Sequence, residues 1–362
     1  MLNCEKLIKP TIYYDKGRLL SYHCFFNMLI GNRGGGKTYG FKTWAIDDFI
    51  ATGRQFIWVR RYGTEIEMLK GDKKSENNDS FLSDIEDKYK GHKLEIKGSK
   101  KKGKILVDDK VAGFYFALST SSIAKSTIYP KVDKIIFDEF LIFGNTYHYL
   151  NSEVELLLEF VETIFRNREY EAQFDPKVVK PRGVYLVGNN ITLANPYFLY
   201  FNIKPFRQNF YIDKNRGLLV EQYKNDSFVA IKRASSLGKL TAGTTYAEYA
   251  FENKAFMDNE RFIAPKPSNA TFNCAIDYKG RTFGFWLDYK NGNMYVNYKY
   301  DPDSYNHYSL TKEDHSINTF LVKNLKNTYI NNVVWLFRAG CMYFEDQQIK
   351  AQVYELLSYF VR

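Results

Sequence analysis

The chain has 362 residues, of which 45% are hydrophobic and 25% are charged, a composition typical of a globular protein and outside the range of disordered chains. At roughly 100 to 200 residues per domain, this length predicts two domains. Lysine and arginine outnumber aspartate and glutamate by 51 to 41, and the net charge of +10 favours an anionic partner such as nucleic acid.

Cysteine spacing and hydropathy exclude two further classes of protein. The four cysteines stand far apart without a C-x-x-C pair, so neither a zinc site nor a disulfide framework is predicted. No apolar run approaches the roughly 18 residues that a membrane-spanning helix needs, and the N-terminus lacks an apolar signal core. We therefore expect an intracellular protein with no membrane partner.

Residues 31–38 (GNRGGGKT) match the phosphate-loop pattern G-x-x-x-x-G-K-[S/T]. An apolar run at 24–30 precedes them, and 39–50 carry apolar residues at helical spacing, so strand, loop and helix follow in the required order. Backbone N–H groups of such a loop surround the phosphates of a nucleotide. Lys37 is expected to reach the β- and γ-phosphates and Thr38 to bind Mg²⁺. The residues predicted to bind the nucleotide are Gly31, Arg33, Gly34, Gly35, Gly36, Lys37 and Thr38. The alternative is a glycine-rich turn with a chance lysine.

A second strand is predicted at 55–61, ending in Arg60 and Arg61, and a polar insertion follows over 63–110. Within it we expect an exposed loop at 70–78, a helix near 81–89 and a β-hairpin over 93–108. The hairpin tip, Lys100 to Lys102, is interpreted either as a solvated edge that discourages aggregation or as a contact to a phosphate backbone.

Residues 134–140 form an apolar strand that ends in two adjacent acids, the Walker B pattern. Asp138 is expected to support Mg²⁺, and Glu139 to orient and activate the attacking water. A merely solvated strand end is the alternative.

The next segments complete an α/β pattern. Ser152 to Glu155 have capping-box spacing and open a helix that finishes at 166–168, where arginine is also favoured by the helix dipole alone. The strand at 184–190 ends in amides, and an asparagine there is suited to sensing the γ-phosphate or the attacking water. Strand, loop and helix repeat in the order of a mostly parallel α/β sheet with its active edge at the strand C-termini.

A change of character near residue 200 marks a domain boundary. We predict an ATPase domain over 1–200, a basic linker over 201–240 and a smaller α+β domain over 241–362. In the last domain, a helix is expected at 246–256, three strands at 272–277, 282–288 and 294–300, and an amphipathic helix at 353–361.

These motifs together resemble the DNA-encapsidation (genome-packaging) ATPases of small tailed phages with protein-primed linear genomes, relatives of the large-terminase motors. The resemblance rests on residues 30–39 (IGNRGGGKTY), 56–62 (FIWVRRY), 136–140 (IFDEF), 165–169 (FRNRE) and 195–198 (NPYF), and more loosely on 283–288 (FGFWLD).

The resemblance implies a P-loop NTPase of the additional-strand, catalytic-glutamate class that binds ATP and Mg²⁺ and assembles into a ring, which is expected to be a pentamer. Each site would lie between two subunits. Arg166 matches an arginine finger acting on the neighbouring subunit, with Arg168 as its rival, and Lys125 matches a second basic residue acting in trans. Arg60 matches a lid arginine and Asn189 a polar sensor, while Arg33 is expected to face the neighbour.

The resemblance also implies that the C-terminal domain has a ribonuclease-H-type fold. Asp277 and Asp288 lie on the expected hairpin, and a strand-end acid such as Asp277 is interpreted as structural or vestigial.

The leading hypothesis is a motor that translocates double-stranded viral DNA into an empty capsid through backbone contacts. Its implied partners are the capsid portal and, through the C-terminal domain, RNA or another viral protein, in the host cytoplasm with transient docking at the portal. The alternatives are a packaging enzyme whose C-terminal domain also cleaves DNA, and a non-motor P-loop switch in assembly.

Overall fold

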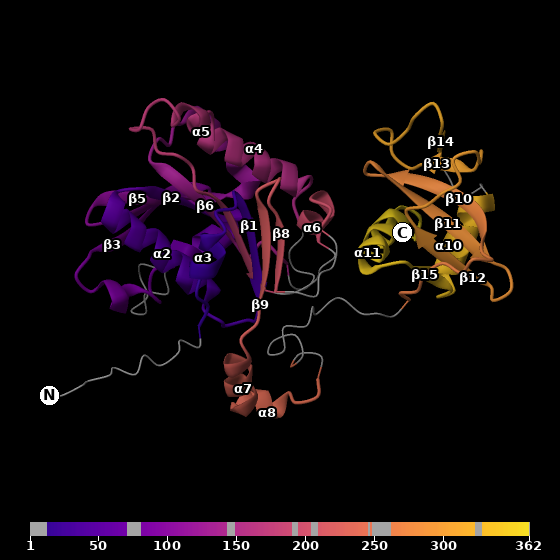
Figure 1. Ribbon diagram of the computed structural model, residues 1–362, viewed down its shortest axis with the longest axis horizontal. Helices are drawn as coiled ribbons and strands as arrows, with labels where there is room; N and C mark the ends of the chain where they lie inside the picture. The colour runs from indigo at the N-terminus through magenta and orange to yellow at the C-terminus, as the bar shows by residue number, and fades with distance from the viewer. Residues whose placement is uncertain are drawn as a thin grey trace. The chain divides into compact units, whose positions relative to one another are not determined.

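The protein is described by a computed structural model that covers residues 13–70, 81–142, 149–189, 195–203, 209–244, 247, 262–322 and 328–361. Contacts divide the chain into two units, which are described separately (Figure 1). The first unit comprises 1–192 and 203–256, and the second comprises 193–202 and 257–362.

The first unit is built on a nine-stranded sheet with the order β3-β4-β5-β2-β6-β7-β1-β9-β8. Its strands are β1 (Phe26–Gly31), β2 (Gln55–Arg60), β3 (Leu94–Gly98), β4 (Lys102–Val107), β5 (Lys110–Ala117), β6 (Val132–Asp138), β7 (Gly183–Asn189), β8 (Phe210–Asp213) and β9 (Leu218–Tyr223). The strands from β5 to β9 in this order run parallel, while β3, β4 and β8 extend the edges antiparallel. Every residue of β1 and β6 is buried, because both faces of a parallel sheet are covered.

The position of β7 confirms the predicted fold class. It lies between β1, which leads into the phosphate loop, and β6, which ends in the two acids. This is the additional strand that separates the two nucleotide-site strands. All three strands are parallel, so their C-terminal ends meet at one edge of the sheet.

Helices cover both faces of this sheet, with α2 and α3 on one face and α4 on the other (Figure 1). On the α2 face, Phe41 and Ile46 pack with Trp58 and Ile136 in one buried cluster. On the other face, α4 contributes Phe160, whose ring contacts Phe116 of β5. The helices of this unit are α1 (Gly17–Ser21), α2 (Lys37–Thr52), α3 (Gly63–Lys70), η1 (Glu86–Tyr89), η2 (Leu118–Ser126), α4 (Glu153–Phe165), α5 (Arg168–Glu171), α7 (Asp226–Ala234) and α8 (Ser236–Leu240).

The segment predicted as a basic linker, 201–240, differs from that interpretation. Its apolar run at Leu218 to Val220 forms the buried strand β9, which pairs in parallel with β1, and β8 pairs with β9. The basic and glycine-rich flanks obscured this run in the sequence. The predicted hairpin in the 63–110 insertion is present as β3 and β4, and it joins the main sheet through β5. The predicted exposed loop at 70–78 falls almost wholly on residues 71–80, outside the described residues.

The second unit holds a six-stranded sheet with the order β14-β13-β10-β11-β12-β15. Its elements are α6 (Pro196–Tyr200), β10 (Thr271–Tyr278), β11 (Arg281–Asp288), β12 (Asn293–Asn297), β13 (His307–Ser309), β14 (Phe320–Leu321), α10 (Thr328–Arg338), β15 (Met342–Phe344) and α11 (Gln347–Val361). The three predicted strands form the antiparallel meander β10-β11-β12, and β13 joins parallel to β10. This α+β arrangement agrees with the ribonuclease-H-type fold that the resemblance implied.

Two helix predictions in this part of the chain have different outcomes. The C-terminal helix is present as α11, which begins at Gln347 rather than at 353 and buries Ile349, Val353 and Leu357 in the core of the unit. The helix predicted at 246–256 lies outside the described residues, apart from Ala247. Among the described helices, none is long and apolar enough to cross a membrane.

Candidate nucleotide site

The phosphate loop connects β1 to α2 and depends on its glycines. Gly36, the residue before the first turn of α2, has φ of +78°, a backbone conformation that L-residues with side chains rarely adopt. At Gly31, a Cβ atom would come within 2.7 Å of the carbonyl oxygen of Tyr223 on β9. The loop can therefore close around an anion at the N-terminus of α2.

Lys37 is the first residue of α2, and its side chain is buried under the loop. Its ammonium group donates hydrogen bonds to the carbonyl oxygens of Gly31 (3.0 Å) and Asn32 (2.5 Å) and to Oδ1 of Asn189 (3.3 Å). Burial lowers the pKa of Lys37 to about 7, and the nearby Asp138 opposes this shift. The strand ends of β1 and β7 thus converge on one ammonium group.

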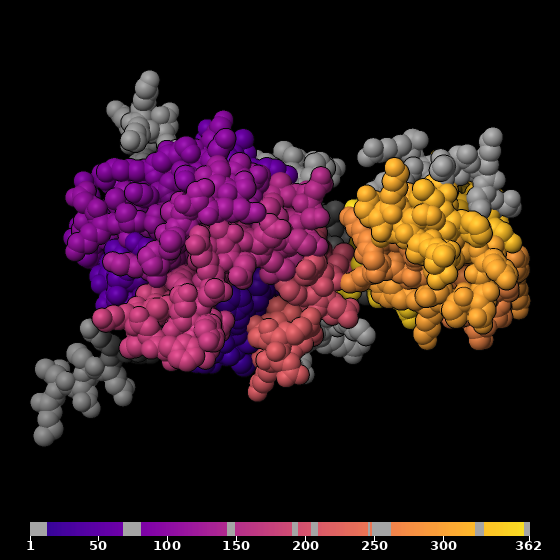
Figure 2. All heavy atoms as spheres, turned by 90° about the horizontal axis from the view of Figure 1, so that it is seen from above, coloured from indigo at the N-terminus to yellow at the C-terminus, as the bar shows by residue number. Residues whose placement is uncertain are grey.

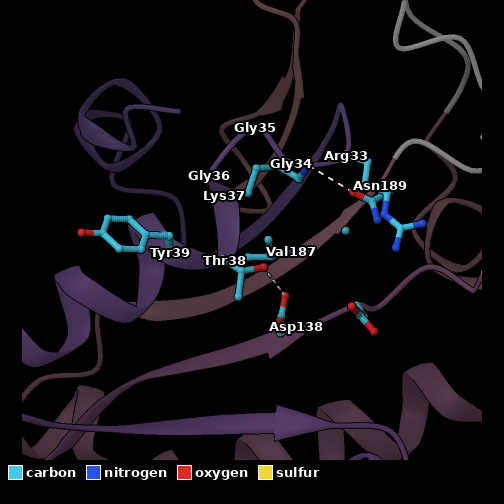
Figure 3. A pocket seen from close by; sticks show the side chains of 12 residues that line it. Arg33, Gly34, Gly35, Gly36, Lys37, Thr38, Tyr39, Asp138, Val187 and Asn189 are labelled. Carbon is cyan, nitrogen blue, oxygen red and sulfur yellow. Dashed lines mark hydrogen bonds between the residues drawn. The ribbon is translucent and has the colours of Figure 1, made fainter. Parts of the chain in front are cut away.

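Thr38 and Asp138 face each other across the site (Figure 3). The Thr38 hydroxyl donates to Oδ1 of Asp138 at 3.0 Å, and Arg60 at the end of β2 donates to Oδ2 at 2.7 Å. Burial raises the pKa of Asp138, while the Arg60 guanidinium acts in the opposite direction. A hydroxyl and a carboxylate oxygen are hard donors of the kind that Mg²⁺ prefers, so these two residues fit a magnesium site.

Glu139 directly follows β6 and has a left-handed backbone with φ of +58°. Its side chain is 59% exposed, and its carboxylate forms an ion pair with Arg60 at 2.7 Å. Asp138 and Glu139 are adjacent in the chain, yet one is buried and the other reaches solvent. Both carboxylates nevertheless reach the Arg60 guanidinium, because the left-handed backbone at Glu139 breaks the alternation by which successive strand residues point to opposite faces.

These residues line a pocket of about 290 Å³. Most of the residues predicted to bind nucleotide contribute to it, and Figure 3 shows Arg33 and Asn189 on the same side of it. The lining consists of Arg33, Gly34, Gly35, Gly36, Lys37, Thr38, Tyr39, Asp138, Glu139, Val187, Gly188 and Asn189. The pocket thus gathers residues from three strand ends that the sequence singled out separately, whereas Gly31 and Arg60 are not among its lining residues.

Lys125 and Arg166 are absent from this lining. Both are exposed and lie near each other where η2 packs against α4. Lys125 forms a 3.6 Å ion pair with Glu159 of α4, and Arg166 donates to the carbonyl oxygen of Thr127 at 3.5 Å. The structure thus brings the two predicted trans-acting residues together, away from the pocket of their own chain.

Arg168, the rival to Arg166, has different surroundings. It is buried, and its guanidinium donates to five backbone carbonyl oxygens at 2.6 to 3.3 Å. The acceptors belong to Pro130, Val132, Ile164, Phe165 and Val179. With its donors committed in this way, Arg168 holds the end of α4 to the start of β6.

The capping box predicted at Ser152 to Glu155 does not form. Ser152 has φ of +48° and makes no side-chain cap. The neighbouring Glu153 instead binds a distant side chain. Its carboxylate accepts two hydrogen bonds from Arg61, at 2.7 and 2.9 Å. The pattern of small and acidic residues indicated the helix start correctly, but tertiary pairing replaced the local cap.

Sequence reasoning also missed the residues that support the loop. The backbone N–H of Tyr14 donates to the Gly35 carbonyl at 2.9 Å, and its hydroxyl donates to Glu221 of β9 at 2.7 Å. Lys232 and Phe228 of α7 lie against Gly34, where a Cβ atom would come within 3.7 Å of each side chain. No local motif marks these residues, because they reach the loop from the N-terminal arm and from beyond β9.

The acids of the second unit do not converge. Asp277 accepts hydrogen bonds from Thr282 and His307, at 2.7 and 2.8 Å, while Asp288 accepts from Asn291 at 2.6 Å and closes the β11–β12 turn. Asp277 pairs with Thr282 at the start of β11, and Asp288 ends that strand, which separates them by about 20 Å at 3.4 Å per residue. In the described part of the chain, no group of three or more His, Cys, Asp or Glu side chains is placed to hold a metal ion.

Comparison with known proteins gives consistent matches over nearly the whole chain. The family described as Podovirus DNA encapsidation protein (Gp16) matches residues 8–360. The DNA packaging protein of Bacillus phage phi29 is 34% identical over 350 residues, which cover 96% of this chain and 97% of that protein.

Two solved structures are similar as well. The bacteriophage phi29 viral genome packaging motor assembly contains a chain that is 33% identical, with a TM-score of 0.74 and coverage of 96% of this chain and 99% of that one. The N-terminal domain of the DNA packaging ATPase from phi29 is 32% identical, with a TM-score of 0.50, and covers 60% of this chain and 100% of that domain.

Proposed function

This chain belongs to the family of podovirus DNA encapsidation proteins (Gp16), and on that premise we propose that it is the ATP-hydrolysing motor that translocates double-stranded viral DNA into an empty capsid. One observation carries the enzymatic part of the proposal. The phosphate loop, the Thr38–Asp138 pair and Glu139 line a single pocket at the C-terminal edge of the sheet. A pocket of this composition suits a nucleoside triphosphate with its magnesium ion.

In the proposed reaction, the loop N–H groups and Lys37 bind the β- and γ-phosphates of ATP. Thr38 and Asp138 hold Mg²⁺, which neutralises charge on the phosphate oxygens when bound. Glu139 accepts a proton from water as the water oxygen bonds to the γ-phosphorus and the bond to the bridging oxygen breaks, releasing ADP and phosphate. Asn189, within reach of Lys37 at the end of β7, orients the γ-phosphate or the water.

We assign Arg166 and Lys125 to the active site of a neighbouring subunit. The assignment is supported by their exposure and by their absence from the lining of their own pocket. Three large apolar side chains are exposed close to them in sequence: Ile128 (67%), Tyr170 (64%) and Phe174 (71%). Figure 2 shows the α4 side of the first unit from above, with the residues around α4 and α5 in magenta. Such a face suits contact with a second copy of the chain in a ring, which we propose to be a pentamer.

The kind of DNA contact that the motor makes follows from its need to move DNA of any sequence. A motor that moves any sequence must contact the phosphate backbone rather than the base edges, and the net charge of +10 is consistent with this. We further propose that the ring works in the host cytoplasm while docked at the capsid portal, and that the second unit contacts RNA or another viral protein.

The proposal is tested by packaging in vitro. Purified protein, empty capsids and viral DNA are mixed with or without ATP and Mg²⁺, and the DNA protected from nuclease is measured. We expect protection only with ATP, and its loss in Lys37→Ala and Glu139→Ala. DNA-stimulated ATP hydrolysis that survives either substitution would show that the assigned site is wrong.

Mixed subunits test the trans assignment separately. Arg166→Ala and Glu139→Ala proteins are each expected to be inactive, and mixing them should restore part of the activity. Restoration occurs because an interface then exists with an intact Glu139 on one side and an intact Arg166 on the other. Failure to restore activity at every mixing ratio would contradict a role for Arg166 across the interface.

A further inference from the structure

Arg61 is a buried charged residue that the proposed mechanism does not use. It follows Arg60, the last residue of β2, but its guanidinium reaches Glu153 of α4, whereas that of Arg60 reaches Asp138. Its side chain and that of Glu153 are only 3% and 0% exposed. The two make a bidentate ion pair, with Nε and Nη2 of Arg61 donating to the two carboxylate oxygens. Removing one partner of such a pair leaves a buried charge without its counter-charge, which lowers stability. The two side chains are therefore held in one geometry.

The remaining donors of Arg61 reach the backbone that carries the proposed catalytic glutamate. Nη2 donates to the carbonyl oxygen of Phe140 at 2.6 Å, and Nη1 donates to the carbonyl oxygen of Glu139 at 3.3 Å. The guanidinium also lies over the rings of Phe137 and Tyr149, at 5.4 and 5.1 Å from their centroids. One side chain therefore contacts the backbone directly after β6 and the first residue of α4.

We infer that Arg61 is a positioning residue for Glu139, and that Glu153 holds Arg61 in place for this purpose. The inference rests on the proposed function, in which Glu139 activates water. The left-handed backbone of Glu139 is a conformation that a non-glycine residue keeps only where its surroundings enforce it. The carbonyl groups of Glu139 and Phe140 directly follow this left-handed φ angle, and Arg61 donates to both of them.

Arginine is suited to this position in a way that lysine is not. Its planar guanidinium presents donors in two directions at once, toward the Glu153 carboxylate and toward the two carbonyl groups. A lysine ammonium is a single point and cannot span both partners. Arg60 and Arg61 consequently act on different parts of Glu139, since Arg60 pairs with its carboxylate and Arg61 with its backbone.

The test compares two Arg→Lys substitutions in the full chain. Arg61→Lys keeps the charge but cannot bridge Glu153 and the turn. Arg182→Lys is the control, because Arg182 likewise forms ion pairs, with Asp48 and Asp133, but lies just before the start of β7, at the edge of the sheet opposite the pocket. Glu153→Gln is a second variant, which preserves the shape of the residue and removes the charge that orients Arg61.

For each protein, kcat and KM for ATP are measured with DNA, together with equilibrium binding of a fluorescent ATP analogue and Mg²⁺. We expect Arg61→Lys to lower kcat on the order of 10²-fold, because a displacement of about 1 Å in a reacting group has that effect. Glu153→Gln should lower kcat in the same direction. KM and analogue binding should stay within about twofold of wild type in both, since the phosphate loop is untouched. Arg182→Lys should leave kcat within about twofold of wild type.

Mixed subunits separate positioning from misfolding. Arg61→Lys subunits should restore activity to Arg166→Ala subunits, because they still supply an intact Arg166. An unchanged kcat in Arg61→Lys, with Glu139→Ala inactive, overturns the inference. A lower kcat without restoration also overturns it, because the defect is then a general loss of structure. Activity in Glu139→Ala instead removes the proposed function and the inference with it.

Discussion

At the scale of single residues, neighbouring arginines of this chain have opposite surroundings. Arg60 lies at the pocket and Arg61 behind the Glu139 turn. Arg166 is exposed, while Arg168 two residues later is buried among backbone carbonyls. The environment of each guanidinium, rather than its identity, separates a candidate for catalysis from a structural clamp.

The pair Arg166 and Arg168 leads to a prediction about stability. Arg168→Ala leaves several buried carbonyl groups without their donor, so we expect it to lower the free energy of unfolding by at least about 3 kcal/mol. Arg166→Ala removes an exposed side chain and should change it by less than about 0.5 kcal/mol. Urea denaturation measures both. Equal destabilisation by the two substitutions would contradict the structural role of Arg168.

Glu221 leads to a prediction about pH. Burial raises its pKa to about 7, and the Tyr14 hydroxyl opposes this by donating to it. Between its ordinary pKa near 4.5 and about 7, the folded protein therefore binds more protons than the unfolded chain, and stability falls as pH rises through this window. Glu221→Gln has no carboxyl group to ionise at this position, so its stability should not fall in this way. As pH rises from 5 to 7.5, the free energy of unfolding of Glu221→Gln should therefore increase relative to that of wild type, by roughly 3 kcal/mol at most.

Thermal melting of both proteins at the two pH values measures the effect. Glu155→Gln, at an exposed site of α4, is the control and should follow the wild type. Parallel behaviour of wild type and Glu221→Gln across this pH range would show that the Glu221 carboxyl is not protonated in the folded protein near neutral pH.

At the scale of elements, β9 is a strand that is difficult to recognise in the sequence because of the residues that flank it. Its three apolar residues are surrounded by lysine, asparagine and glycine, which favour a loop assignment when only the sequence is considered. Burial beside β1 makes it part of the support of the phosphate loop, because Tyr223 at its end contacts Gly31 and Gly35. The C-terminal part of the first unit therefore reaches the nucleotide site.

This arrangement predicts the effect of shortening one side chain in β9. Leu219 is fully buried at 0% exposure and pairs with Asn27 of β1, so Leu219→Ala should lower the stability of the first unit by about 2–5 kcal/mol. Leu240 at the end of α8 is 81% exposed, and Leu240→Ala should change stability by less than about 0.5 kcal/mol. Denaturation followed by tryptophan fluorescence, to which Trp44 and Trp58 in the core of the first unit contribute, measures both. A Leu219→Ala protein as stable as wild type would favour the linker interpretation of 201–240.

At the scale of the whole molecule, the second unit has the strand arrangement of a nuclease-like fold without a convergent set of acids among its described residues. Asp277 binds a threonine and a histidine, and Asp288 closes a turn at the other end of β11. Each acid therefore has a structural use in its own place, and two-metal catalysis needs carboxylates that share metal ions about 4 Å apart.

We accordingly expect no DNA cleavage by this protein. Supercoiled plasmid incubated with the full chain and Mn²⁺ should stay intact, and Asp277→Ala should give the same result. A large terminase with an active nuclease domain provides the positive control. Nicking that disappears in Asp277→Ala would restore the alternative of a packaging enzyme that also cuts DNA.

The sequence by itself determined most of the residues that line the candidate nucleotide pocket. The glycines, Lys37, Thr38, Asp138, Glu139 and Asn189 are each marked by a local pattern, and parallel strands bring the ends of those patterns to one edge of the sheet. The additional strand β7 between β1 and β6 was implied by the resemblance alone, and the structure gives the strand order. Because these signals depend on short contiguous segments, they could be recognised before the structure was known.

Tertiary structure alone decided which side chains surround and support that pocket. Arg61 and Glu153 are 92 residues apart, and Tyr14 and Glu221 are 207 apart, so no local spacing relates them. Burial also separated Arg168 from Arg166, and Glu153 pairs with the distant Arg61 where a capping box of Ser152 and Glu155 was predicted. Local patterns report what a short segment can do, whereas the partner of a buried charge depends on which distant elements the fold packs against it.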